Sequence, residues 1–318
     1  MLYQQFGDEE ALPRQYESMK LFVEAEIRKM GKKNLWIGPS LGDWLAMGKG
    51  IAWQAMHNNP VSNAFIVHDL KVISETAERL GKKADADRYR RQLEATTKAY
   101  IEKFVSKKGI VAKDYQSAYI MALKFVLPEG ELREQVKKNF AANIRKNGLQ
   151  TGFFATEHLL PLLVEAGETE LAYDILLQEG CPGWMYQIKC GATTTWERWD
   201  ALKPDGTVNE EKMAGSGDNM VSFNHYAFGS VGEFYYQYIL GIKPQKPGFA
   251  ELHFEPYPDR RLGGVSGSYL SRAGKIESSW KYEEDGCHIT LSTPVKSEVI
   301  LPDGKKETVE AGTYQWLC

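Results

Sequence analysis

The feature that most constrains the fold of this chain is a change in the period of its apolar residues near residue 241. Before that point apolar side chains recur every three or four residues, which places them on one side of an α-helix. Beyond the turn-rich segment Gly241-Ile-Lys-Pro-Gln-Lys-Pro-Gly248 they alternate every second residue, as in strands with one buried face. The sequence therefore predicts a mainly helical region over residues 1–241 and a small antiparallel β-sandwich over residues 242–318.

Two kinds of helix alternate in the first region. Short, nearly all-apolar helices are expected to be buried, and amphipathic ones to lie outside them. Two concentric rings of helices require this alternation, whereas the absence of a fixed repeat argues against a solenoid. We therefore expect a toroid of the (α/α)6-barrel type, incomplete because a full one needs roughly twelve helices. The expected helices are 9–30, 63–80, 85–105, 116–125, 131–146, 156–166, 168–178 and 226–240.

The second region shows short alternating segments separated by Arg-Ala-Gly, Glu-Asp-Gly and Pro-Asp-Gly turns. This pattern is typical of a β-sandwich. The expected strands are 250–255, 265–271, 275–282, 287–292, 298–301, 306–309 and a closing strand at 309–316.

Composition excludes several classes of partner. The net charge is -3, the lysines and arginines are scattered, and neither nucleic acid nor a membrane is expected as a partner. The start has no signal peptide, so a cytoplasmic location is expected if the chain is complete. The four cysteines are expected to be free thiols, with a Cys181–Cys190 disulfide as the alternative. No cofactor or metal is expected, because no nucleotide or metal motif is present.

The segment Gly191-Ala-Thr-Thr-Thr-Trp-Glu-Arg-Trp-Asp200 combines an acid with aromatic rings. It places Glu197 between Trp196 and Trp199. Aromatic faces stack on sugar rings, and carboxylates bind sugar hydroxyls or carry the proton transfers of glycoside hydrolysis. The same letters contain Thr194-x-x-Glu197, a capping box for a helix start. Both readings stay open on spacing alone.

Two further segments bring polar residues beside aromatic ones. Ser222-Phe-Asn-His-Tyr-Ala-Phe-Gly229 contains Asn224 and His225, and Gly42-Asp-Trp-Leu45 contains Asp43 and Trp44. Asp43 is either a helix cap beside a core tryptophan or part of the same sugar site. His225 taken alone is most often a hydrogen-bonded structural histidine.

Taken together, these segments resemble the α-L-rhamnosidases of glycoside hydrolase family 78. Residues 191–199 and Ser222-Phe-Asn-His-Tyr-Ala-Phe-Gly-Ser-Val-Gly-Glu233 are similar to the two most recognisable C-terminal motifs of that family. The 42–45 loop and Thr151-Gly-Phe153 are similar to lesser ones, and the final β-region matches as well. The likeness covers essentially the whole chain.

The resemblance implies an (α/α)6 barrel followed by a β-sandwich, and an inverting hydrolysis of rhamnosides. Glu197 would be the general base that activates water, and His225 would contact the rhamnose. Trp44 would be an aromatic of the sugar pocket, and Trp196 and Trp199 would help to wall it. Asp43 and Asn224, as members of the same motifs, are further candidates for binding the sugar. The implied ligand is a rhamnose-containing oligosaccharide or glycoside.

The chain departs from the family in one respect. The general acid of the family lies in an Asp-x-x-x-Arg-x-Glu run followed by Gly-Trp-x-Gly-Asp, and this chain contains neither. We therefore expect a C-terminal fragment with low activity alone, whose partner would be the missing N-terminal part of the same enzyme. Within the chain, Asp43, Asp200 and Asp218 are the remaining candidate acids.

Two other functions remain open. One is a non-catalytic carbohydrate-binding or structural piece, in which Trp44, Trp196 and Trp199 hold sugar without cleaving it. The other, more distant, is an isomerase or epimerase, which would need paired histidines as acid and base.

Overall fold

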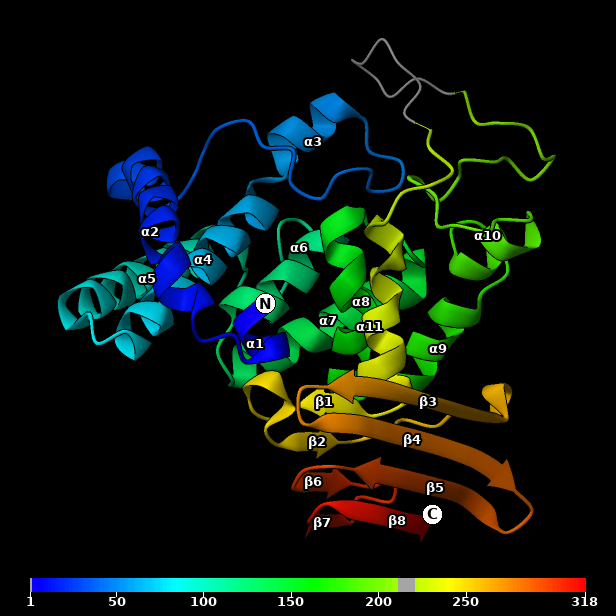
Figure 1. The fold of residues 1–318 in the computed structure, drawn as a ribbon. Coiled ribbons are helices and arrows are strands. Elements are labelled where there is room, and N and C mark those ends of the chain that lie inside the picture. Colours follow the sequence, from blue (N-terminus) through cyan, green and yellow to red (C-terminus); the bar gives the residue numbers. More distant parts are fainter. Residues whose placement is uncertain (1, 211–220) are drawn as a thin grey trace. The chain divides into compact units, whose positions relative to one another are not determined.

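The structure is a computed structural model that describes residues 2–210 and 221–318 (Figure 1). Its contacts group the chain into two compact units, Tyr16–Ser230 and Met1–Gln15 with Val231–Cys318. The expected division after residue 241 stays a prediction. Among the described residues, none of the helices combines the length and the apolar content that crossing a bilayer would require.

Helical hairpins form most of the first unit (Figure 1). Each hairpin joins a helix to the next one along the chain, and the first pair, α4 and α5, runs closely side by side. The first member of the second pair, α6, continues into a π-helical turn at Ala122–Val126. The three hairpins consist of α4 (Asn59–Arg79) with α5 (Lys83–Phe104), α6 (Gln116–Met121) with α7 (Glu131–Asn147), and α8 (Phe153–Glu165) with α9 (Thr169–Leu177).

Burial distinguishes the two members of each pair. The first member is the more buried one in every pair. In α4, 11 of 21 residues are buried, compared with 4 of 22 in α5; in α6 all 6 are buried, compared with 5 of 17 in α7; and in α8 9 of 13 are buried, compared with 4 of 9 in α9. The expected alternation of inner and outer helices is therefore confirmed. It follows from the sequence, because a helix that is apolar on all sides must be covered on all sides.

The remaining helices are α1 (Leu2–Phe6), α2 (Ala11–Met30), α3 (Ile51–His57), α10 (Trp184–Lys189) and α11 (Val231–Phe234). Short 3₁₀ turns lie at Gly31–Lys33 and Ala227–Ser230, and a π-helical turn at Tyr235–Ile239. The apolar stripe of α2 packs against α4 and α5 in a cluster that contains Val23, Leu70 and Tyr89.

The second unit contains two four-stranded sheets, with the strand orders β1-β2-β6-β7 and β3-β4-β5-β8. Phe254 of β2 faces Trp316 of β8, with ring centroids 6.1 Å apart, so side chains of the two sheets meet as in a sandwich. The strands are β1 (Ile242–Pro244), β2 (Leu252–Phe254), β3 (Gly264–Ser271), β4 (Gly274–Glu283), β5 (Gly286–Thr293), β6 (Ser297–Ile300), β7 (Lys306–Val309) and β8 (Gly312–Leu317).

One strand pair corrects the expectation of a wholly antiparallel sandwich. β2 and β6 are parallel, with Leu252 opposite Ser297, whereas the other pairs are antiparallel. Alternation of apolar residues indicates that a strand has one buried face, but it does not specify the direction of the neighbouring strand. Two segments that are distant in the chain can therefore pair in either direction.

Candidate functional site

The segment that carries Glu197 is a loop that pairs with the loop at residues 222–225. The backbone N–H of Glu197 donates to the carbonyl of Ser222 at 2.8 Å, and the N–H of His225 donates to the carbonyl of Thr195 at 2.9 Å. The hydroxyl of Thr194 donates to the carbonyl of Phe223. No helix begins here, so the capping-box reading is wrong. The N–H of Glu197 is satisfied by a distant loop and not by a helix cap.

The carboxylate of Glu197 differs from that of its neighbour Asp200. Glu197 is half-buried, and within the described residues its carboxylate has neither a hydrogen bond nor an ion pair. Asp200 accepts from Arg198 Nε at 2.7 Å, from Arg198 Nη2 at 2.9 Å and from Asn209 Nδ2 at 2.9 Å. The first carboxylate can therefore bind a ligand or a water, whereas the second is held in an ion pair.

His225 has a defined ring orientation. Its Nδ1 accepts from the backbone N–H of Ala227 at 3.3 Å, which places the proton of the neutral ring on Nε2. The ring lies 4.6 Å from that of Phe153 and is stacked on Tyr226 at 5.4 Å. Tyr226 is 88% exposed, and the neighbouring Asn224 is also exposed. The side chains of His225, Tyr226 and Asn224 are thus accessible to a ligand on the 222–229 loop.

Asp43 is fully buried, and its carboxylate binds the start of α8. It accepts from the backbone N–H groups of Gly152, Phe154 and Ala155 at 2.8, 2.8 and 3.1 Å, and from the hydroxyl of Ser117. Burial holds the pKa of this carboxyl above its ordinary value, although the four donors each lower it. An oxygen acceptor at the N-terminus of a helix satisfies free N–H groups and lies at the positive end of the helix dipole.

This position does not fit the expectation that Asp43 binds a sugar hydroxyl, because no part of the side chain is exposed. Its neighbour Trp44 is half-buried and lines a cleft. The carbonyl of Trp44 accepts from the N–H of Phe153 at 3.0 Å, and a Cβ at Gly152 would lie 2.1 Å from that oxygen. Only glycine therefore allows the 42–45 loop to approach α8 so closely.

Trp196 and Trp199 are 2% and 0% exposed, so their rings do not fit the expected role as walls of a sugar pocket. Trp199 is stacked on Phe228 at 3.8 Å, and its Nε1 donates to the carbonyl of Thr151 at 3.0 Å. The four segments that the resemblance singled out therefore meet at the start of α8. Trp199 supports the Glu197 loop from the inside.

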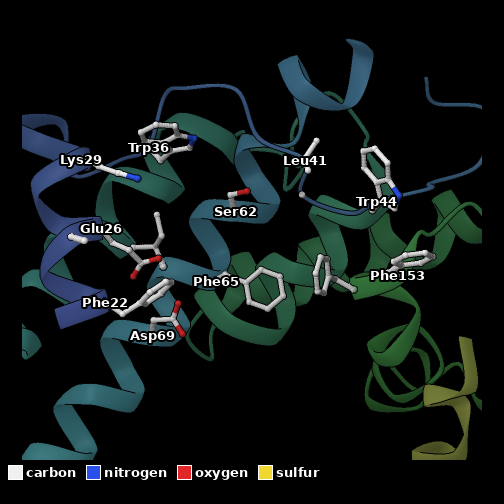
Figure 2. A pocket seen from close by; sticks show the side chains of 14 residues that line it. Phe22, Glu26, Lys29, Trp36, Leu41, Trp44, Ser62, Phe65, Asp69 and Phe153 are labelled. Atoms are coloured by element: carbon white, nitrogen blue, oxygen red, sulfur yellow. The ribbon is translucent and has the colours of Figure 1, made fainter. Parts of the chain in front are cut away.

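The cleft beside Trp44 has a volume of about 810 Å³ and lies between α2, α4 and the start of α8 (Figure 2). Trp44 and Phe153 lie at one end, and Glu26 and Asp69 at the other (Figure 2). Burial raises the pKa of Glu26 from 4.5 to about 8, with a further contribution from Asp69. Burial also raises the pKa of Asp69 from 3.8 to about 6.

The sequence analysis missed this pair of carboxylates. The signal was present, because Glu26 lies between Val23 and Met30 on the apolar stripe of α2, and Asp69 lies between Ile66 and Ile73 on that of α4. An acid on the buried side of an amphipathic helix needs a partner or a proton.

Of the other expectations, Asp218 lies outside the described residues. The four cysteines are free thiols, so the alternative Cys181–Cys190 disulfide is not formed. In the part of the chain that the structure describes, one group has the spacing of metal ligands: Glu283, Asp285 and His288, in the second unit. Asp285 and His288 already pair at 2.7 Å. The expectation that no metal takes part stays a prediction.

Comparison with known proteins places both regions of the chain in one family. Residues 1–239 match the bacterial alpha-L-rhamnosidase 6 hairpin glycosidase domain, and residues 241–315 match the bacterial alpha-L-rhamnosidase C-terminal domain. An alpha-L-rhamnosidase of Alteromonas sp. (strain LOR) is 34% identical over 312 residues, which are 95% of this chain and 33% of the relative.

Solved structures agree with this result. The alpha-L-rhamnosidase of Aspergillus terreus superposes with a TM-score of 0.90 at 29% identity, over 99% of this chain and 37% of that one. The Streptomyces avermitilis enzyme complexed with L-rhamnose gives 0.89 at 30% identity, over 99% and 31%. The chain thus spans about a third of the length of these relatives. It belongs to the family of the bacterial alpha-L-rhamnosidase six-hairpin glycosidase domain.

Proposed function

We propose that this chain supplies the general-base part of an inverting α-L-rhamnosidase site, in which Glu197 activates the water that attacks the sugar. The observation that carries the proposal is the position of Glu197. Its backbone is fixed to the 222–225 loop, while its carboxylate has no partner among the described residues. A general base must keep its carboxylate free for water and hold it in a fixed place.

The neighbouring groups suit the binding of a deoxy sugar. The Nε2–H of His225 can donate to a hydroxyl, and the Asn224 amide can donate and accept. Trp44 offers an aromatic face at the cleft. We propose that these three side chains contact the rhamnose. Asp43, Trp196 and Trp199 are buried and would not contact the sugar. We propose that they fix the loops that carry the contacting side chains.

The general acid is proposed to come from outside this chain. An inverting pair needs two carboxyl groups about 6.5–9.5 Å apart on opposite sides of the sugar bond. Asp43 is enclosed and Asp200 is paired with Arg198, so neither is free to donate a proton to a ligand. Without its acid an enzyme of this kind loses about 10²–10⁴-fold in rate, so the chain alone should show little hydrolysis.

The test is the hydrolysis of an aryl α-L-rhamnoside by this chain mixed with the part of the Alteromonas sp. relative that lies outside its match to this chain. Glu197→Gln should reduce the rate by about 10²-fold or more. Glu102→Gln, on the outer helix α5, is the matched control and should leave the rate unchanged. A mixture whose activity survives Glu197→Gln would contradict the assigned role.

A non-catalytic sugar-binding piece is the second candidate, favoured by the aromatic cleft beside Trp44. Calorimetry with L-rhamnose separates the two functions. If the chain binds the sugar, and the mixture binds it without releasing product from the aryl rhamnoside, the binding role is correct. Binding that is lost in His225→Ala would place the sugar at the 222–229 loop in either case.

A further inference from the structure

Two of the four free cysteines lie opposite each other in the β-unit, the second of the two compact units. The backbone N–H of Cys287 donates to the backbone oxygen of Cys318 at 2.8 Å, and the N–H of Cys318 donates to the carbonyl of Cys287 at 3.0 Å. These bonds continue the antiparallel pairing of β5 with β8, in which His288 lies opposite Leu317 (Figure 1). Residues that exchange both bonds are directly opposite, with Cα atoms about 5.5 Å apart.

Both side chains lie on the face of this sheet that is turned toward the other sheet. Cys287 is 3% exposed and lies two positions before Ile289, which is buried on the same face of β5. Cys318 lies two positions after Trp316, whose ring faces Phe254 of the other sheet. The two thiols therefore share one side of one sheet.

Electrostatic effects agree with this placement. Burial raises the pKa of the Cys318 thiol, and a backbone hydrogen bond from Asp303, in the turn between β6 and β7 of the other sheet, opposes that rise. Burial also raises the pKa of Cys287, and the proximity of Cys318 raises it further. Each thiol is thus in the interior, and the two sulfur atoms are close enough for the charge of one to affect the other.

The backbone of this pair meets the requirement for a disulfide without a change in strand pairing. Bonded cysteines usually have Cα atoms about 4.4–6.8 Å apart, and directly opposite residues of an antiparallel pair fall within that range. The other two cysteines lack this arrangement, because Cys181 and Cys190 lie on either side of α10 and neither is in a strand.

We propose that Cys287 and Cys318 form a site of reversible oxidation, at which a small-molecule disulfide links the two thiols and clamps the end of β8 to β5. Cys318 reacts first, because it is half-buried whereas Cys287 is enclosed. The proposal does not depend on the role of Glu197.

The reaction consists of two thiol–disulfide exchanges. Cys318 loses its proton to water, and its thiolate attacks one sulfur of the reagent, so that the S–S bond of the reagent breaks and one reagent thiolate leaves. Cys287 then loses its proton, and its thiolate attacks the Sγ atom of Cys318 and displaces the second reagent thiolate. The cysteines together lose two protons and two electrons, and the reagent is reduced to two thiols.

The new bond is tested on the full chain with oxidised glutathione at about pH 8.5, near the ordinary pKa of a thiol. Trypsin cleaves after Lys281, Lys296 and Lys306, so the disulfide would join peptide 282–296 to peptide 307–318. Mass spectrometry should find this linked pair once the remaining thiols are alkylated, and dithiothreitol should abolish it. The control, Cys181→Ser combined with Cys190→Ser, retains the pair and should give the same product.

The clamp is tested by hydrogen exchange of β5 and β8 in urea, which reports the opening of these strands alone. A cross-link over about 30 residues restricts the unfolded chain, so oxidation should lower the ratio of unfolded to folded β-unit about 10²-fold or more. Cys318→Ser changes a half-buried side chain and should fold, and oxidised glutathione should leave its exchange unchanged. Cys287→Ala is a second variant without the pair and should behave in the same way.

Three results would overturn the proposal. The first is a chain that forms no linked peptides, whether it is unmodified or keeps glutathione on Cys318, since Cys287 would then be out of reach. The second is a linked pair found only in a disulfide-bonded dimer. The third is a linked pair that leaves the exchange of β5 and β8 as fast as in the reduced chain, because the bond would then clamp nothing.

Discussion

The carboxylate of Asp43 and the backbone N–H of Gly152 are joined by a hydrogen bond of 2.8 Å across 109 positions of the chain. This bond fixes the loop that carries Trp44 to the start of α8. Three more donors converge on the same carboxylate, from Phe154, Ala155 and Ser117. The geometry of the candidate site therefore depends on one buried acid that no ligand can reach.

Asp43→Asn should destabilise the helical unit by about 3 kcal/mol. An amide has one accepting oxygen, and its NH₂ group would face donors, so at least one buried N–H would lose its acceptor. The measurement is the free energy of unfolding in urea. Asp87→Asn, which removes an exposed acid paired with Arg90, is the control and should change stability by no more than about 0.5 kcal/mol. Equal losses in the two variants would contradict the capping role.

Gly152→Ala tests the close approach of the same two segments. The added Cβ would lie 2.1 Å from the carbonyl oxygen of Trp44, and backbone atoms cannot yield as a flexible side chain does. We expect a loss of about 2–3 kcal/mol. Gly180→Ala is the matched control, because no described atom lies within 4 Å of its added Cβ. If both variants had the urea midpoint of the wild type, the contact between Gly152 and the carbonyl of Trp44 would tolerate a Cβ, contrary to the structure.

Much of the fold could be predicted from apolar periodicity. The helix expected at 85–105 is Lys83–Phe104, and the strand expected at 275–282 is Gly274–Glu283. The π-helical turn at Ala122–Val126 and the parallel pairing of β2 with β6 were not predicted. Both depend on what the segment packs against, and the local sequence does not contain that information.

The candidate site was less accessible to sequence reasoning. Thr194-x-x-Glu197 has the letters of a capping box, yet the N–H of Glu197 bonds to Ser222, 25 positions away. Asp43 was correctly considered as a cap, but the helix that it caps begins at Phe153 and not beside it. A local pattern shows that a donor or acceptor needs a partner. It does not show which distant segment supplies that partner.

Trp199→Phe should destabilise the chain by about 2 kcal/mol. The substitution removes the Nε1–H that bonds to the carbonyl of Thr151, and it leaves a space beside Phe228. Urea unfolding gives the loss, and near-ultraviolet circular dichroism reports whether the aromatic cluster is retained. Trp316→Phe, in the β-unit, is the comparison: it also loses an Nε1–H bond, to Glu307, but its ring is half-buried, so it should cost less. An equal loss from the two variants would mean that the full burial of Trp199 adds nothing to stability.

The stability of the isolated chain should depend on pH through Glu26. The folded pKa of about 8 lies above the ordinary value of 4.5, so the folded state retains a proton that the unfolded state has released. This contribution is fully present below about pH 4.5 and is lost as the pH rises through about 8. Glu26→Gln keeps a neutral side chain, so it should raise the urea midpoint at about pH 9 and change it little at about pH 4.5.

Glu24→Gln, two residues earlier on α2, should behave in the opposite way. Burial raises the pKa of Glu24, but hydrogen bonds from Arg88 and Tyr89 outweigh it and lower the pKa below 4.5. The stability that Glu24 contributes is therefore present above that ordinary value and is lost as the pH falls through the folded pKa. Glu24→Gln should lower the urea midpoint at neutral pH. If both variants shifted the midpoint in the same direction at about pH 9, burial would not raise the pKa of Glu26 as the structure indicates.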